Sequence, residues 1–189
     1  MQNCLGIYIE NNLIKYAKVS KDRDTFKVDA FGIRFFDNLN EAIKKIVEET
    51  YSFTTPISIN LANEQYLYYD IFALLSKNDI QKTVETEFET FCDENKYNQK
   101  AFETRYALVS NVQNKERIKA IQVIVNKIEL NKQKQYLEKH NLSGILPIGT
   151  AIASITRFEK KENVLIVNME EKTTITTIYD RQIYNVETI

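Results

Sequence analysis

Residues 4–19 read CLGIYIENNLIKYAKV, and their pattern of apolar and polar residues is the strongest indication of the fold. Its first part, Cys4 to Ile9, is a short and mostly apolar run that is typical of a buried strand. Glu10-Asn11-Asn12 predicts a turn, because asparagine tolerates the left-handed backbone region. Leu13 to Val19 then alternates apolar and polar side chains, so the stretch predicts a hairpin of two strands.

The residues that follow extend this hairpin and then change its period. Thr25 to Phe36 predicts a third strand, bent at Gly32, so the chain begins with an antiparallel meander. Asn40 to Thr50 has the apolar spacing of one helix face. After Pro56, the alternation of Ile57 to Leu61 predicts another strand.

The middle of the chain predicts a mixture of strands and helices. Ser76 looks like the N-cap of a helix that buries Ile80, Val84, Phe88 and Phe91. A later helix is expected to end at Leu142-Ser143-Gly144, with Gly144 as its C-terminal cap. The other expected elements are an extended segment at 66–75, strands at 104–110 and 119–126, and helices at 129–140 and 150–158.

The end of the chain repeats the pattern of its start. Val164 to Val167 predicts a buried strand, and a polar turn separates it from alternating strands at 173–179 and 182–188. This echo begins 160 residues after Cys4. We expect further sequence to follow residue 189, because no helix covers this second meander.

The charges of the chain nearly balance. Its 25 Lys and Arg and 26 Asp and Glu give a net charge of -1 over 189 residues, without a basic block. Nucleic acid is therefore not an expected partner. Only four glycines are present, which argues against phosphate-binding loops whose backbone must approach a ligand closely.

The thiols and the single histidine do not predict a metal or catalytic site. Cys4 and Cys92 are far apart, so we expect two reduced, mostly buried thiols. His140 follows a polar helical stretch and is expected to be a solvated residue at a helix end. A signal peptide and a membrane-spanning run are both absent from the sequence. We expect a cytoplasmic protein that meets the inner membrane through a partner, without direct membrane insertion.

The repeated strand, turn and strand resemble the actin-like ATPase superfamily, in which two such turns are the phosphate loops. Residues 5–15 look like its first loop, which usually reads LGIDIGSSxIK, and residues 164–174 resemble the second. Within the superfamily the chain is most similar to the PilM group of type IV pilus assembly and to its relative FtsA. The middle also carries this likeness, at residues 72–80, 104–109, 121–125 and 137–153.

The loops depart from the family pattern where the chemistry would occur. The resemblance implies an Asp in each loop that organises a metal ion, but Tyr8 and Asn168 stand there and offer no carboxylate. Glu10, Glu170 and Lys172 replace small loop residues, and a carboxylate at a phosphate cradle repels the ligand. We therefore expect a degenerate ATPase that needs no cofactor, with ATP and magnesium retained only in an alternative hypothesis.

Five residues of the two loops remain compatible with phosphate binding. They are Asn11, Asn12, Lys15, Thr173 and Thr174. The same residues also suit a two-residue hairpin turn, a solvated strand face and an ordinary strand, so both interpretations stay open. No catalytic or metal-ligating residue is predicted.

Two other groups of side chains favour ordinary structural roles. The acidic residues of the helix after Ser76 fit a solvated helix face better than a paired-carboxylate hydrolase. Aromatic residues in the strands fit a core with one partner-facing edge. Thr104, Tyr106 and Phe72 are expected to line a groove between two subdomains. In PilM-like proteins the cytoplasmic tail of the membrane protein PilN docks in such a groove, and a peptide can add beside a sheet edge.

The sequence therefore predicts an α/β protein with an actin-like, ribonuclease-H-type mixed sheet. We expect a first subdomain at 1–74 with 146–162, an inserted α/β subdomain at 75–145, and the start of a second half at 163–189. The expected function is a scaffold that binds the tail of a PilN-like protein. The alternatives are a nucleotide-binding ATPase with unusual loops, a GspL-type domain of type II secretion, and a self-associating filament protein of the FtsA kind.

Overall fold

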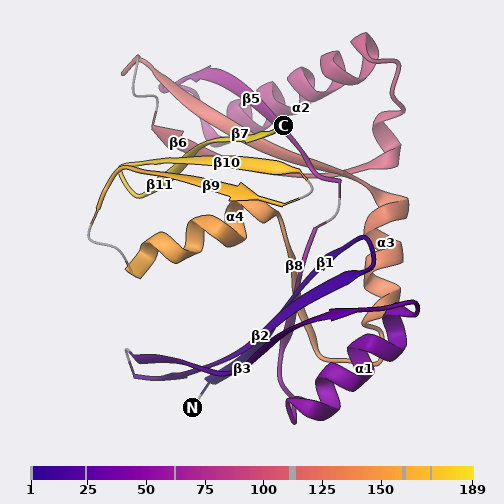
Figure 1. Cartoon of the computed structure of the whole chain (residues 1–189). Coiled ribbons are helices and arrows are strands. Elements are labelled where there is room, and N and C mark those ends of the chain that lie inside the picture. The colour runs from indigo at the N-terminus through magenta and orange to yellow at the C-terminus, as the bar shows by residue number, and fades with distance from the viewer. Residues whose placement is uncertain (1, 24, 62, 111–113, 159–160, 171) are drawn as a thin grey trace. The chain divides into compact units, whose positions relative to one another are not determined.

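The computed structural model describes residues 2–23, 25–61, 63–110, 114–158, 161–170 and 172–189, and Figure 1 shows their helices and strands. The chain divides into two compact units. The first unit consists of Met1–Leu61 and Asn131–Leu146, and the second of Ala62–Leu130 and Pro147–Ile189. Among the described residues, no helix is both long and apolar enough to cross a membrane.

The first unit contains a five-stranded mixed sheet. Its strands lie in the order β3-β2-β1-β4-β8, and β4 pairs in parallel with both of its neighbours, whereas β1, β2 and β3 form an antiparallel meander. The helices and strands of this unit are β1 (Gln2–Glu10), β2 (Leu13–Asp22), β3 (Thr25–Phe35), α1 (Leu39–Glu49), β4 (Ile57–Asn60), α3 (Lys127–Tyr136) and β8 (Leu142–Leu146). The first residues of α3, up to Leu130, belong to the second unit.

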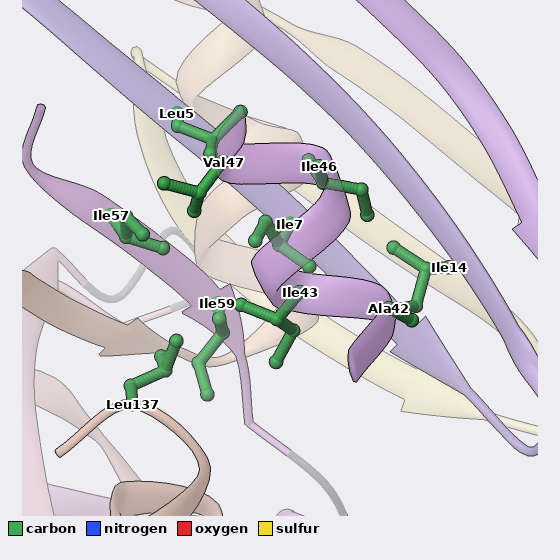
Figure 2. Close-up of a cluster of buried hydrophobic side chains, with 10 residues drawn as sticks. All are labelled: Leu5, Ile7, Ile14, Ala42, Ile43, Ile46, Val47, Ile57, Ile59 and Leu137. Atoms are coloured by element: carbon green, nitrogen blue, oxygen red, sulfur yellow. The ribbon is translucent and has the colours of Figure 1, made fainter. Parts of the chain in front are cut away.

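Helix α1 covers one face of this sheet. The helix begins because the Asn38 side chain accepts a hydrogen bond from the Glu41 N–H at 3.2 Å, which satisfies one of the first free amides. Its apolar face packs against β1, β2 and β4, as Figure 2 shows. The buried cluster is aliphatic throughout: Leu5, Ile7, Ile14, Ala42, Ile43, Ile46, Val47, Ile57, Ile59 and Leu137.

The second unit contains two three-stranded antiparallel sheets. One has the order β5-β7-β6, from β5 (Gln65–Phe72), β7 (Arg117–Asn126) and β6 (Phe102–Ser110), and α2 (Lys77–Glu94) packs on it. The other has the order β11-β10-β9, from β11 (Gln182–Thr188), β10 (Thr173–Tyr179) and β9 (Val164–Met169). The remaining elements are α4 (Ile148–Ala153) and the 3-10 helices Gln99–Ala101 and Ser154–Phe158.

The structure confirms most of the predicted elements, but Gly144 does not cap a helix. Helix α3 ends at Tyr136, and Gly144 lies within β8, paired with Ser58. None of the four glycines has a positive φ. The prediction was wrong because Leu142 and Ile145 pack against the aliphatic cluster, and a fifth strand buries them better than a loop would.

Two single-residue expectations are also corrected. On α2 the fourth buried position is Cys92, whereas Phe91 is only partly buried. His140 lies in a turn after α3 and is half-buried, and this burial lowers the pKa of its imidazole. Cys92 is buried and Cys4 half-buried, and both are free thiols.

The predicted subdomain bounds, 1–74 with 146–162, 75–145 and 163–189, stay a prediction. The strand pairings place β5 beside β7 and β8 beside β4. The extended segment after residue 65 therefore belongs to the sheet of β6 and β7, and residues 142–146 belong to the sheet of the first meander.

Candidate functional site

The first candidate loop is a tight turn between β1 and β2. Glu10 pairs with Leu13, so Asn11 and Asn12 are the two turn residues, and both are exposed. Asn11 has a φ of 48°, in the left-handed region that asparagine tolerates better than most residues. The turn therefore forms without glycine at this position.

Tyr8, which stands where the resemblance to actin-like ATPases implies a loop aspartate, has a lysine beside its ring. Tyr8 and Lys15 are directly opposite each other on β1 and β2, and the Lys15 ammonium lies 5.6 Å from the centre of the Tyr8 ring. Such a cation–π contact is worth roughly 0.5–1 kcal/mol at a half-exposed site. Tyr8 offers no carboxylate to a magnesium ion, and the ammonium group beside its ring supplies no metal ligand either.

A pocket beside the first turn has a balanced charge. Its volume is about 440 Å³, and Asn12 contributes to its lining. The charged lining residues are two cations, Arg34 and Lys45, and two carboxylates, Asp37 and Glu41. Arg34 also makes a bidentate ion pair with Glu49, with both distances at 2.7 Å. A triphosphate would find no excess of positive charge in this lining.

The base of the first turn is held by two amide side chains that sequence reasoning missed. The Asn60 side chain accepts from the Ile9 N–H at 2.7 Å and donates to the Ile9 carbonyl at 3.0 Å. The pairing of β1 with β4 ends at Ile7 and Ile59, so the Asn60 amide continues the ladder by one step. The Gln133 amide in turn donates to the Asn60 carbonyl at 3.0 Å. Both side chains are buried, which makes these bonds costly to lose.

The second candidate loop joins β9 to β10. Asn168 pairs with Thr174, and Met169 with Thr173 is the last pair of the two strands before the loop. Thr174 is buried and Thr173 is half-buried. The Thr173 N–H donates to the Ile189 carbonyl at 3.1 Å, and its carbonyl accepts from the Ile189 N–H at 2.9 Å. Of the two threonines, Thr173 has the more accessible side chain.

The structure thus brings Asn11, Asn12 and Lys15 together in one hairpin, and Thr173 with Thr174 in another. The first hairpin belongs to the first unit and the second hairpin to the second unit. Whether the two hairpins contact one phosphate group stays a prediction. Among the described residues, no cluster of His, Cys, Asp and Glu side chains is able to hold a metal ion.

A half-buried polar cluster in the second unit lies at the start of α4. The Glu64 carboxylate accepts from the Ile148 N–H at 2.8 Å, and the Tyr66 hydroxyl accepts from the Gly149 N–H at 3.3 Å. Burial raises the pKa of the Glu64 carboxyl, and the bond from Ile148 opposes that rise. Burial also raises the pKa of the Tyr66 phenol, with the nearby Glu64 as a second cause. These groups hold the helix in place.

A second cluster joins β5 and β7 to β11. The Tyr68 hydroxyl donates to the Val186 carbonyl at 2.6 Å and accepts from the Val186 N–H at 2.7 Å. The Lys119 ammonium lies 4.6 Å from the Tyr68 ring centre and 4.1 Å from that of Tyr184. Burial raises the pKa of Tyr68 to about 12 and lowers that of Lys119. Tyr68 stays a neutral hydrogen-bonding group at neutral pH.

The sequence carried weak signals for these clusters. Tyr66, Tyr68 and Tyr69 stand close together in a strand, but nothing nearby in the sequence indicates partners as distant as Gly149 and Val186. These contacts become visible only with the fold.

The comparisons with known proteins show the fold. No family model and no curated protein sequence matches the chain. A solved PilM–PilN type IV pilus biogenesis complex contains a chain that is similar over 98% of this chain, with 13% identity and a TM-score of 0.78. The match covers 61% of that chain, so this protein spans less than two thirds of its length.

Two further structures agree. The cytoplasmic domain of EpsL, an inner membrane component of the type II secretion system of Vibrio cholerae, matches over 100% of this chain and 71% of its own, with 13% identity and a TM-score of 0.69. A Bacteroides thetaiotaomicron protein with an actin-like ATPase fold and unknown function matches over 100% and 70%, with 11% identity and a TM-score of 0.50. The chain therefore has an actin-like fold similar to that of the PilM–PilN complex, and the predicted fold class is confirmed.

Proposed function

We propose that this protein is a PilM-like scaffold of a type IV pilus or related secretion machine. The observation that carries the proposal is the structural match to a chain of the PilM–PilN complex over 98% of this chain. The residues of the loops support a role without hydrolysis, because Tyr8 stands where the resemblance implies a metal-organising carboxylate. The protein would act at the cytoplasmic face of the inner membrane and bind the cytoplasmic tail of a PilN-like protein.

The outer strands of the β5-β7-β6 sheet offer surfaces for such a tail. Phe72 on β5 is 56% exposed and Tyr106 on β6 is 40% exposed. The Arg117 guanidinium lies 4.7 Å from the Phe72 ring centre, which adds a cation to an apolar surface. An extended peptide beside a strand edge gains main-chain hydrogen bonds, and exposed aromatic side chains give it apolar contact.

Fluorescence anisotropy with a labelled peptide tests this proposal. The peptide is the cytoplasmic tail of the PilN-like protein encoded by the same organism. We expect saturable binding and at least about a tenfold loss of affinity in one of Phe72→Ala and Tyr106→Ala but not in both, because the two side chains lie on different outer strands and on opposite faces of the sheet. Truncating a central aromatic contact costs more than about 1 kcal/mol. Phe53→Ala is the matched control, since Phe53 is 64% exposed in the first unit. A peptide that fails to bind at about 1 mM would refute the proposal.

The nucleotide-binding alternative has its own test. Calorimetry with ATP and magnesium is done on the complete protein, because the resemblance places the nucleotide between the two halves. We expect no binding up to about 1 mM ATP. Micromolar binding that disappears in Lys15→Ala would show that the loops still hold phosphate, and the scaffold without nucleotide would then be wrong.

The match to the EpsL cytoplasmic domain favours type II secretion as the second candidate function. EpsL is an inner membrane component of that system, and the match covers 71% of its cytoplasmic domain. Copurification from the native cell distinguishes the two candidates. Capture of pilus assembly proteins supports the first, whereas capture of type II secretion proteins supports the second.

A further inference from the structure

We propose that the free edge of β3 is a self-association surface, at which a second copy of this chain pairs through a two-fold axis at Ile33. This inference is independent of the proposed function, since it concerns the first unit alone. In the order β3-β2-β1-β4-β8, β3 is an outer strand with a partner on one side. It has 11 residues, which is long for an edge strand.

The side chains on one face of β3 form an apolar stripe. Phe31, Ile33 and Phe35 are opposite Ala17, Lys15 and Leu13, whereas Arg34 and Gly32 are on the face that α1 covers. The stripe is open to solvent, with exposed fractions of 80% for Phe31, 67% for Ile33 and 74% for Phe35. Adjacent exposed apolar side chains of this size are typical of an interaction surface.

The backbone of the same residues points toward the free edge. The Phe36 N–H donates to the Asn12 carbonyl at 2.9 Å, so Phe36 faces β2. Because successive residues of an antiparallel strand face opposite sides, Arg34 and Gly32 also face β2. The N–H and C=O groups of Phe31, Ile33 and Phe35 therefore face outward, where a second strand is able to bind them.

A bulge separates this straight segment from the start of β3. Val28 pairs with Val19 and Ala30 with Lys18, which leaves Asp29 as the extra residue. A bulge bends its strand and increases the local twist, which protects that part of an edge from pairing. Residues 30–36 contain no bulge that would protect their edge from pairing. The open part of the edge is thus short and has a defined centre.

An antiparallel copy fits this segment when Ile33 is opposite the same residue of the second copy. Phe31 is then opposite Phe35 of the other copy, and all three pairs exchange backbone hydrogen bonds. Aromatic pairs directly across two strands stabilise a sheet. On the other face, Arg34 is opposite Gly32, and its charge is already balanced by Glu49 at 2.7 Å. Within residues 30–36 no like charges are directly opposite each other in this register, and this self-complementarity favours a second copy over an unrelated peptide.

The size of the stripe predicts a weak dimer. Covering the exposed parts of the three side chains and the strand edge removes on the order of 500 Å² per copy from solvent. A standard stable interface buries about 800 Å² per partner. We therefore expect dissociation in the micromolar to submillimolar range.

Sedimentation velocity of the 189-residue chain tests the proposal directly. Between about 1 µM and about 1 mM, we expect the sedimentation coefficient to rise from that of a monomer to that of a dimer. Ile33→Lys and Ile33→Glu should each be monomeric, because two like charges meet at the axis. An equimolar mixture of these variants should form a heterodimer. Ile155→Glu is the matched control, since Ile155 is 62% exposed elsewhere in the chain, and it should dimerise normally.

A second set of variants tests the register. Phe31→Lys and Phe35→Glu should each weaken the dimer, whereas the double variant should restore it, because each lysine then faces a glutamate of the other copy. Circular dichroism confirms that each variant is folded. The proposal is overturned if the chain is monomeric at every concentration, if both Ile33 variants still dimerise, or if the opposite charges fail to restore pairing.

Discussion

The aliphatic core of the first unit and the polar junctions of the second unit show two ways of holding a sheet. In the first unit, ten buried aliphatic residues fill the space between α1 and the strands (Figure 2). In the second unit, Glu64, Tyr66 and Tyr68 hold α4 and β11 through hydrogen bonds to backbone groups. The stability of the first unit therefore depends mainly on filled side-chain volume, whereas that of the second unit depends on single polar atoms and on close approach of backbone segments.

The largest effect is expected from a cavity in the first unit. Ile43 is fully buried on α1, and Ile43→Ala should lower the free energy of unfolding by about 2–5 kcal/mol, because the lost side chain leaves unfilled space. Urea denaturation followed by circular dichroism measures this loss. Ile155→Ala, at an exposed position, should change stability by no more than about 0.5 kcal/mol. Equal losses in the two variants would contradict the aliphatic core as described.

A smaller loss is expected where α4 approaches β11. A Cβ on Gly149 would lie 2.7 Å from both γ-carbons of Val186 and 3.1 Å from the Tyr66 hydroxyl. Gly149→Ala should therefore destabilise the second unit by about 1–3 kcal/mol, as overpacking does. Gly144→Ala is the control, because its nearest neighbouring atom is 3.9 Å away. Adding Val186→Ala should recover part of the loss, and the absence of any recovery would place the strain elsewhere.

Removing the hydroxyl group of Tyr68 tests the polar junction by deleting a single oxygen atom. Tyr68→Phe keeps the ring beside Lys119 but leaves the N–H and C=O of Val186 without their partner. We expect a loss of about 1–2 kcal/mol in thermal unfolding, with faster hydrogen exchange at the Val186 amide. Tyr51→Phe, at a position that is 82% exposed, should have no measurable effect. An unchanged exchange rate at Val186 would refute the role given to this hydroxyl.

The smallest effect is expected from the titration of Glu64. Burial raises the pKa of its carboxyl in the folded state, so the folded protein binds this proton more tightly than the unfolded chain does. The stabilisation is complete below the unfolded pKa and is lost as pH rises through the folded pKa. At neutral pH, Glu64→Gln should therefore be more stable than the natural protein, by less than about 1 kcal/mol, and the difference should vanish under acidic conditions. A difference independent of pH between 4 and 7 would contradict this cause.

The sequence predicted the fold well where one pattern of side chains has one structural solution. The alternation in residues 4–19, the helical face of Ala42 to Val47 and the echo at 164–188 each correspond to observed elements. The resemblance to the actin-like fold rested on that echo. The prediction for Gly144 was wrong because a glycine after a helix favours a cap, whereas the segment that contains Gly144 forms a strand in the sheet of the first unit.

The site was less predictable from the sequence. Asn11 and Asn12 do form the expected turn. The side chains that hold its base, Asn60 and Gln133, could not be predicted, because their hydrogen bonds depend on the end of β1 lying beside β4. Tyr68 bonds to a residue 118 positions later, so no local pattern indicates the contact. Contacts between polar groups that are far apart in the sequence depend on the three-dimensional fold, so a local sequence pattern does not predict them.

The position of β8 also governs how the chain is completed during synthesis. Ile57 of β4 pairs with Leu142 of β8, 142 − 57 = 85 residues later. At translation rates of about 5–20 residues per second, Leu142 of β8 is synthesised roughly 4–17 s after Ile57 of β4. The β5-β7-β6 sheet uses only residues 65–126 and is complete earlier. The inserted segment is therefore ready to fold while the N-terminal sheet still exposes the edge of β4, and a pause in translation before residue 142 would prolong that exposure.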